Sequence, residues 1–181
     1  RRHVLTVAYV YDLPFFKDQK NFLGYVAGGW QLSGIFSYNS GTPVTVTSAL
    51  GNDPGGLGIL GPSAAGPRPD RLRDSLTPNM RNIDRAFDTS AFAEVPVGVA
   101  RPGNSGRSVL IGPNIVRWDF SIFKQIPVGE RFKFQLRGEA FNAFNRANFN
   151  APVAALGNPN FGRITGARDP RNIQLGAKFV F

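Results

Sequence analysis

Apolar and polar residues alternate with a period of two along several stretches of this chain. The clearest stretch runs from Phe132 to Ala140, where one side is apolar and the other carries charged or amide groups. The apolar positions are Phe132, Phe134, Leu136, Gly138 and Ala140, and the polar positions are Lys133, Gln135, Arg137 and Glu139. Because successive side chains of a strand point to opposite faces, this stretch is predicted to be a strand with one apolar face.

Four further stretches show the same alternation. Their apolar positions are Leu5, Val7, Tyr9 and Tyr11; Trp30, Leu32, Gly34, Phe36 and Tyr38; Trp118, Phe120 and Ile122; and, within the segment from Arg171 onwards, Ile173, Leu175, Ala177, Phe179 and Phe181. No comparable stripe with the 3.6-residue period of an amphipathic helix is present. The chain is therefore predicted to be all-β, with about five strands of roughly the 9 to 11 residues that a tilted strand needs to cross a bilayer.

The connections between these strands alternate in length. A modest turn at 16–22 is followed by a long, Gly- and Pro-rich stretch at 48–113, a tight turn at 127–130 and a longer loop at 146–170. Short periplasmic turns and long extracellular loops alternate in this way in outer-membrane barrels. We therefore expect an antiparallel meander with long extracellular loops, in which 48–113 is the longest loop.

The apolar stripes have two readings, a lipid-facing surface or the core face of a soluble sheet, since half-buried strands of either kind alternate in the same way. Aromatic residues concentrate near the predicted strand ends, where the interfacial girdles of a barrel lie. This distribution favours the membrane. Five strands cannot close a transmembrane barrel, which needs about eight or more. We therefore expect residues 1–181 to be the C-terminal part of a larger barrel.

Composition narrows the alternatives. The chain has 181 residues, with 16 Phe, 21 Gly, 14 Pro and no Cys, which excludes disulfides and cysteine chemistry within it. Its net charge is +9, but the basic residues are scattered rather than gathered in a run, so we do not expect nucleic-acid binding. No apolar run is long enough for a membrane-spanning helix, and the first residues lack the pattern of a signal peptide.

Residues arranged for catalysis are not evident, and we expect no enzymatic activity, no metal site and no cofactor. The single histidine, His3, is isolated, and Asp84 and Asp88 lie four residues apart in a loop, which more often indicates solvation than acid–base work. The polar stripes instead supply candidate ligand-binding residues on the lumen side of the barrel. These are Asp119, Lys133, Gln135, Arg137 and Glu139, which are equally suited to pairing with one another.

Several motifs in the second half of the chain resemble a known family. They include the segments 103–107, 118–124, 139–145 and 161–171, and the alternating end of the chain at 173–181. This half resembles the tail of TonB-dependent receptors of the Oar-like kind. The resemblance implies an N-terminal carboxypeptidase-regulatory-like domain and a plug, followed by a barrel of about 22 strands.

The same resemblance implies partners and a location. The last segment is similar to the C-terminal β-signal that the barrel-assembly machinery reads, with Gln174, Gly176, Phe179 and Phe181 as its signal residues. The implied location is the outer membrane of a Gram-negative bacterium, in contact with lipid and lipopolysaccharide. The implied activity is uptake of a bulky ligand, such as an iron chelate, a glycan or a peptide, with TonB acting through an N-terminal region that this chain does not contain.

Two other functions remain open at the level of sequence. One is a non-transporting outer-membrane barrel, either an adhesin or a structural porin whose long loop binds partners. The other is a soluble β-sandwich binding module. A plug domain upstream of this chain would favour a receptor over a non-transporting barrel. Folding of the isolated chain in water without detergent would favour the soluble module.

Overall fold

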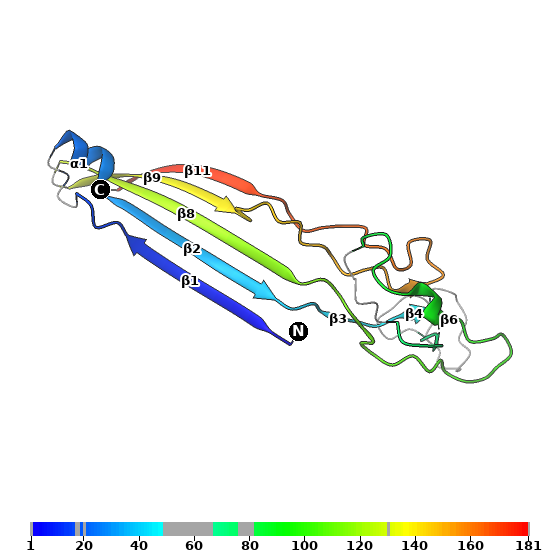
Figure 1. Ribbon diagram of the computed structural model, residues 1–181. Coiled ribbons are helices and arrows are strands. Elements are labelled where there is room, and N and C mark those ends of the chain that lie inside the picture. Colours follow the sequence, from blue (N-terminus) through cyan, green and yellow to red (C-terminus); the bar gives the residue numbers. More distant parts are fainter. Residues whose placement is uncertain are drawn as a thin grey trace. The chain divides into compact units, whose positions relative to one another are not determined.

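Residues 2–16, 19, 21–48, 67–75, 82–129 and 131–180 are described by a computed structural model of the chain (Figure 1). They fall into two compact units. The sheet unit is drawn from His3–Asn39, Ile115–Ala147 and Asp169–Phe181, and the loop unit from Arg1–Arg2, Ser40–Asn114 and Asn148–Arg168.

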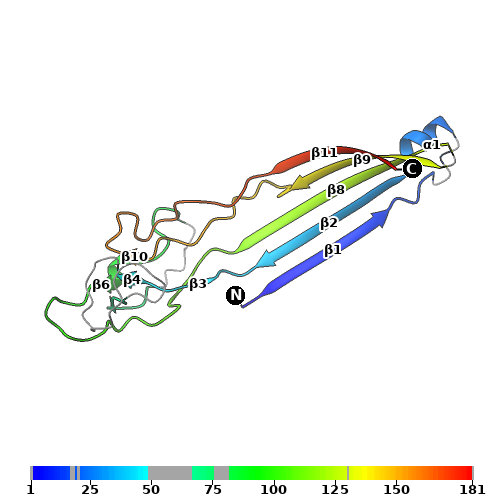
Figure 2. The same ribbon diagram turned by 180° about the vertical axis from the view of Figure 1, so that it is seen from behind.

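Five long antiparallel strands form the sheet unit, as the alternation predicted. Their order in the sheet is β1-β2-β8-β9-β11, so each strand pairs with its neighbour in the meander (Figures 1 and 2). The strands are β1 (Val4–Asp12), β2 (Trp30–Asn39), β8 (Ile115–Val128), β9 (Phe132–Phe141) and β11 (Asn172–Val180). The all-β prediction is therefore confirmed.

The short connections differ in detail from the sequence-based prediction. Pro127 and Val128 still belong to β8, and the turn follows at Gly129, whose positive φ of 73° suits glycine. The other short connection contains a helix, α1 (Phe22–Ala27), where the alternation predicted none. Six residues are too few to display a helical period, so the sequence pattern carried no signal for it.

The strand register brings the predicted apolar stripes onto one continuous face. Partners in an antiparallel pair point to the same side, and Leu32 pairs with Ile122, which pairs in turn with Gly138. We call this surface the apolar face. Its described members are Leu5, Val7, Tyr9, Tyr11, Trp30, Leu32, Gly34, Phe36, Tyr38, Val116, Trp118, Phe120, Ile122, Lys124, Ile126, Val128, Phe132, Phe134, Leu136, Gly138, Ala140, Ile173, Leu175, Ala177 and Phe179.

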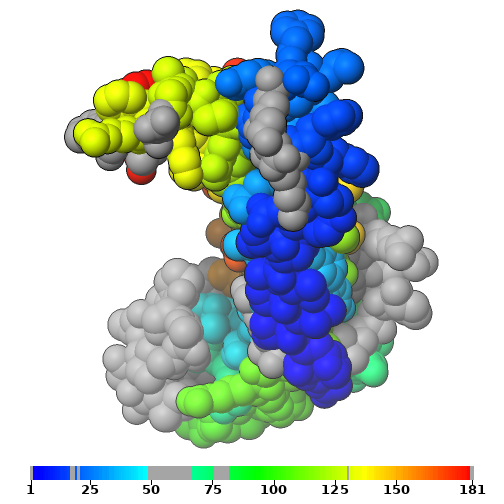
Figure 3. All heavy atoms as spheres, turned by 90° about the vertical axis from the view of Figure 1, so that its left-hand side faces the viewer, coloured from blue at the N-terminus to red at the C-terminus, as the bar shows by residue number. Residues whose placement is uncertain are grey.

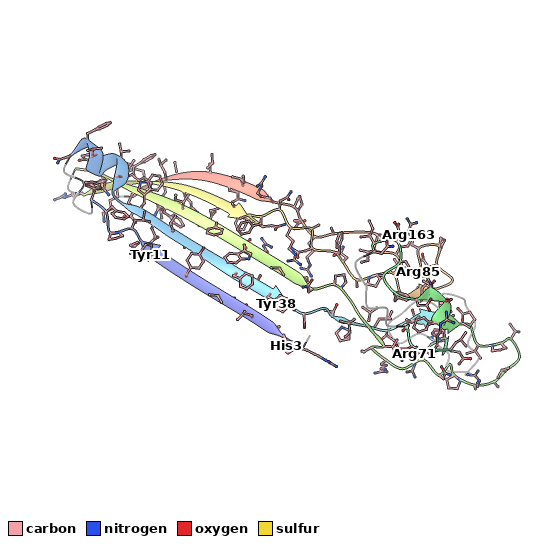
Figure 4. All side chains as sticks on the ribbon, in the orientation of Figure 1. His3, Tyr11, Tyr38, Arg71, Arg85 and Arg163 are labelled. Carbon is pink, nitrogen blue, oxygen red and sulfur yellow. The ribbon has the colours of Figure 1, made fainter. Side chains whose placement is uncertain are left out.

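Aromatic rings gather at both ends of the apolar face. Tyr11 lies towards the end with the short turns and Tyr38 towards the opposite end (Figure 4). Near Tyr38, the rings of Phe36 and Trp118 have centroids 4.7 Å apart, and at the turn end those of Phe132 and Phe179 are stacked at 5.5 Å. Between these two groups, the rings of Tyr9 and Phe120 lie on either side of Gly34 with their centroids 6.2 Å apart. Aromatic residues at both ends of the strands are typical of a barrel wall between its two membrane interfaces.

The loop unit has a hydrophobic core of its own. The residues of this core are Val46, Ala86, Phe87, Ala91, Phe92 and Leu110, with Val44, Val109, Leu156, Phe161 and Ile164 packed against it. The Phe87 ring makes edge-to-face contacts with Phe92 at 5.9 Å and with Phe161 at 5.2 Å. Phe161 comes from the β9–β11 connection and the other two rings from the β2–β8 connection, so the two long connections fold together.

Short elements support this core. They are β3 (Pro43–Val44), β4 (Thr47–Ser48), β5 (Asp70–Arg71), η1 (Thr89–Ala91), β6 (Phe92–Ala93), β7 (Leu110–Ile111) and β10 (Ala155–Leu156). Parallel pairing of β4 with β10 joins the two connections directly. Among the described residues, no helix has the length and apolar character needed to span a membrane.

Candidate ligand-facing surface

The side of the sheet opposite the apolar face carries most of the polar side chains of β8, β9 and β11, together with exposed Val10 and Ile35 over β1 and β2. We call this side the polar face. One row across it contains Ser33, Ser121, Glu139 and Gln174. A second row, beyond that of Arg137, joins Gln125, Gln135 and Lys178. All five predicted ligand-binding residues belong to this polar face. In a barrel whose apolar face meets lipid, the polar face lines the lumen.

Asp119 is engaged in the architecture of the sheet. Its carboxylate accepts hydrogen bonds from Nε of Arg117 and from the backbone N–H of Asn142, each at 2.8 Å. Asn142 has a positive φ of 50°, and its side-chain amide donates to the carbonyls of Arg146 and Asp169. Asp119 therefore fixes the corner where β9 ends and the return to β11 begins, a role that sequence reasoning did not identify.

Arg137 and Glu139 form an ion pair along β9, with Nη2 and Oε1 2.6 Å apart. The hydroxyl of Ser121 also donates to Glu139, at 3.4 Å, and the guanidinium of Arg137 lies 5.6 Å from the centroid of the Phe123 ring. Glu139 is largely buried, whereas about half of the Arg137 side chain is exposed. The geometry thus presents an oriented guanidinium on the polar face, and planar guanidinium groups bind carboxylates and phosphates through paired hydrogen bonds.

The remaining predicted residues occupy the turn end of the sheet. Lys133 is exposed and lies opposite Pro127, and Gln135 lies between Gln125 and Lys178. These positions suit a lumen-facing role and lie several residues along the sheet from Asp119, so the five candidates form a stripe rather than one compact pocket. Their role in ligand binding stays a prediction.

The predicted assembly residues divide between the two faces of β11. Gln174 and Gly176 are on the polar face, opposite Glu139 and Arg137, and Phe179 is on the apolar face, stacked on Phe132. Phe181 lies outside the described residues. A Cβ added at Gly176 would have Cβ of Arg137 as its nearest neighbour, at 3.9 Å, so packing alone does not require glycine there.

Ion pairs in the loop unit were not predicted. Arg101 makes a double contact with Asp70, at 2.7 and 2.6 Å, and the pKa of Asp70 is lowered chiefly by that hydrogen-bonded guanidinium. Asp88 accepts hydrogen bonds from Ser90, Arg73 and Arg85, which together hold its pKa well below the ordinary range. Arg101 lies 31 residues from Asp70 and Arg73 lies 15 residues from Asp88, so local spacing did not reveal these two pairs.

The surface of the sheet unit decides between the membrane and soluble readings. Large apolar side chains of the apolar face are exposed on β1, β8, β9 and β11 and half-buried on β2, with Leu175 at 86% exposed as the extreme. A contiguous exposed surface of this kind does not suit water and suits lipid. An antiparallel sheet with one such face, a polar reverse face and alternating connection lengths defines the wall of an outer-membrane β-barrel.

Comparison with known families agrees with this class. The chain belongs to the outer membrane beta barrel domain family, whose model matches residues 1–174. The protein is accordingly located in the outer membrane of a Gram-negative bacterium, and the soluble β-sandwich alternative is wrong. Neither a curated protein nor a solved structure matches the chain.

Proposed function

We propose that this chain is the barrel wall and extracellular part of a TonB-dependent receptor of the Oar-like kind, which takes up a bulky ligand. The observation that carries the proposal is the co-folding of the two long connections around one hydrophobic core. Both connections leave the same end of the sheet, because Asn39 pairs with Ile115 and Phe141 with Asn172. A folded extracellular unit offers a preorganised surface on which a large ligand can bind.

The polar face supports the same proposal. Its charged side chains include the oriented Arg137 and the exposed Lys133, and they give a wetted lumen on which a ligand with carboxylate or phosphate groups can move. Lysine and arginine outnumber aspartate and glutamate by 21 to 12 in the chain, which favours anionic ligands. The proposal includes no catalysis, and the energy comes from TonB acting on a plug outside this chain.

A conductance measurement on the full-length protein tests transport against a porin. In a planar bilayer, a plugged receptor is expected to show no steady open channel, and it should bind the purified periplasmic domain of TonB. A porin would show stable ohmic conductance and no binding to TonB. A closed barrel that does not bind TonB would instead point to an adhesin, and would contradict the proposal.

The proposal also covers how strand β11 takes part in assembly of the barrel. We infer that the barrel-assembly machinery recognises β11 through Gln174, Gly176, Phe179 and Phe181. Within the described residues β11 is an edge of the sheet, and an unpaired edge strand is a template for addition of another strand. Deleting Phe181 from the full-length protein should leave it unfolded in the periplasm, as a heat-modifiability assay would show. Normal insertion would contradict this assignment.

A further inference from the structure

Helix α1 presents large apolar side chains that are exposed among the described residues. Phe22 and Leu23 are 81% and 66% exposed, and Tyr25 and Val26 are also exposed. Figure 3 shows the side chains of this part of the chain standing clear at one end of the sheet. An exposed cluster of large apolar groups is unfavourable in water and indicates a surface that contacts another protein or a membrane.

Lys124 determines the side of the sheet on which α1 lies. It is the only charged residue among the described members of the apolar face, yet only 5% of it is exposed. Its ammonium donates to the carbonyl of Val26 at 3.3 Å and to that of Gly28 in a shorter contact. These carbonyls belong to the end of α1, where helix geometry leaves acceptors without partners and favours a cation.

Other contacts hold the same arrangement. The indole N–H of Trp30 donates to the carbonyl of Val26 at 2.9 Å, and the Lys124 ammonium lies 5.3 Å from the centroid of the Trp30 ring. The backbone N–H of Gln125 also donates to Gly29, at 2.8 Å. Since Lys124 and Trp30 both belong to the apolar face, α1 is fixed on that face at the turn end of the sheet.

We infer that α1 is an interfacial anchor that inserts into the phospholipid leaflet on the periplasmic side of the outer membrane. The apolar face meets lipid, and α1 extends that surface where the sheet ends. Short apolar helices rich in aromatic residues settle at the boundary between head groups and acyl chains. The turn end lies opposite the long extracellular connections, which assigns α1 to the periplasmic leaflet and its phospholipids.

Lys124 is the positioning residue of this anchor. A bare ammonium on a lipid-facing strand is unfavourable, and such residues are found paired with one another or with backbone carbonyls. Here the carbonyls of the α1 end supply that pairing, so burying the charge and docking the helix are a single event. This inference depends on the barrel lying in the outer membrane and not on the proposed transport activity.

The lipid contact of α1 can be measured in the full-length protein reconstituted into phosphatidylethanolamine and phosphatidylglycerol vesicles. The chain has no cysteine, so an environment-sensitive fluorophore can be attached at Leu23→Cys, with Phe22→Cys as a second site. The matched control is Gln125→Cys, which is exposed on the polar face next to Lys124.

We expect the labels on α1 to emit at shorter wavelength than the control and to be quenched severalfold more by lipids with a quencher near the head group than by aqueous iodide. The Gln125 label should show the opposite preference. Iodide quenching of both α1 labels as strong as that of the control would overturn the anchor.

Replacing the positioning residue tests how α1 is held. Lys124→Met keeps an unbranched side chain and removes its charge. The label at Leu23 should then lose most of its lipid quenching while the barrel stays heat-modifiable. If the lipid quenching is unchanged, Lys124 does not hold the helix. If Lys124→Met fails to assemble, Trp30→Phe is the second variant, which removes the hydrogen bond from the indole to the carbonyl of Val26. It should weaken the lipid quenching of the Leu23 label in part. Unchanged quenching in Trp30→Phe would contradict this mode of docking.

Discussion

The sheet unit and the loop unit treat their apolar residues in opposite ways. In the loop unit, Phe87 and Leu110 are wholly buried within a small core. In the sheet unit, Leu175 and Ile173 stand exposed, and the described buried hydrophobic residues all lie in the loop unit. The same chain therefore contains one region built for water and one built for lipid. Solvent, and not composition, decides where an apolar residue is placed.

The largest expected effect concerns the core of the loop unit. Phe87→Ala leaves a cavity among Phe92 and Phe161 and is expected to destabilise the loop unit by about 3–5 kcal/mol. Limited proteolysis and hydrogen exchange should show faster opening of this unit, while heat-modifiability of the barrel stays unchanged. Val97→Ala, at a side chain 93% exposed, is the control and should change little. An equal effect of the two variants would show that the loop core contributes no stability.

The next effect sharpens the contrast between the two faces of the sheet. Leu136→Arg places a charge on the apolar face and should destabilise the inserted barrel by about 2–4 kcal/mol if the site is near the bilayer midplane. Gln135→Arg puts the same side chain one residue away on the polar face and should have little effect. Urea titration of the barrel in lipid vesicles compares them. Similar losses in both variants would remove the distinction between lipid and lumen.

A smaller effect is expected at the corner that Asp119 supports. Asp119→Ala leaves the backbone N–H of Asn142 without its acceptor, which should cost about 1–3 kcal/mol if no water replaces the carboxylate. Asp119→Asn retains an acceptor oxygen and should be milder. The same urea titration ranks the two variants. If Asp119→Ala has no effect on stability but abolishes ligand uptake, Asp119 binds the ligand and does not stabilise the corner between β9 and β11.

The smallest effect is a pH dependence confined to the loop unit. The pKa values of Asp70 and Asp88 are lowered by their arginine partners, so their contribution is fully present above about pH 4 and is lost as the pH falls towards the folded-state values. Hydrogen exchange of the loop unit should therefore accelerate in acid, less so at high salt, because exposed pairs are screened. Asp70→Asn should flatten part of this dependence, and an unchanged profile would exclude the pair with Arg101 as its source.

The sheet was predictable because its information is local. The alternation of apolar and polar residues within each strand shows which side chains share a face. The pairing register of β9 with β8 is also specified, since a shift by one residue would place Leu136 on the polar face. The polar-face residues were therefore found with the face they occupy. The Arg137–Glu139 pair also follows from their spacing of two along one strand.

The loop unit and α1 could not be predicted because their information is not local. Phe87 meets Phe161 although the two come from different connections that are separated along the chain by β8 and β9, and neither residue lies in a periodic segment. The bond between Asp119 and Asn142 depends on a turn with positive φ, which the sequence around Asn142 permits but does not specify. The six residues of α1 are too few to display a helical period, and the contacts of Lys124 that hold this helix come from a residue about 100 positions further along the chain.

The central claim is that one face of the sheet meets lipid while the other meets water. Spin labels placed one at a time along β9, from Lys133 to Glu139, test it in the full-length protein reconstituted in lipid vesicles. Collision with oxygen, which concentrates in lipid, should be high at Phe134, Leu136 and Gly138, and collision with a water-soluble nickel complex should be high at Lys133, Gln135 and Arg137. Accessibility that fails to alternate, or alternates in the opposite sense, would contradict the account.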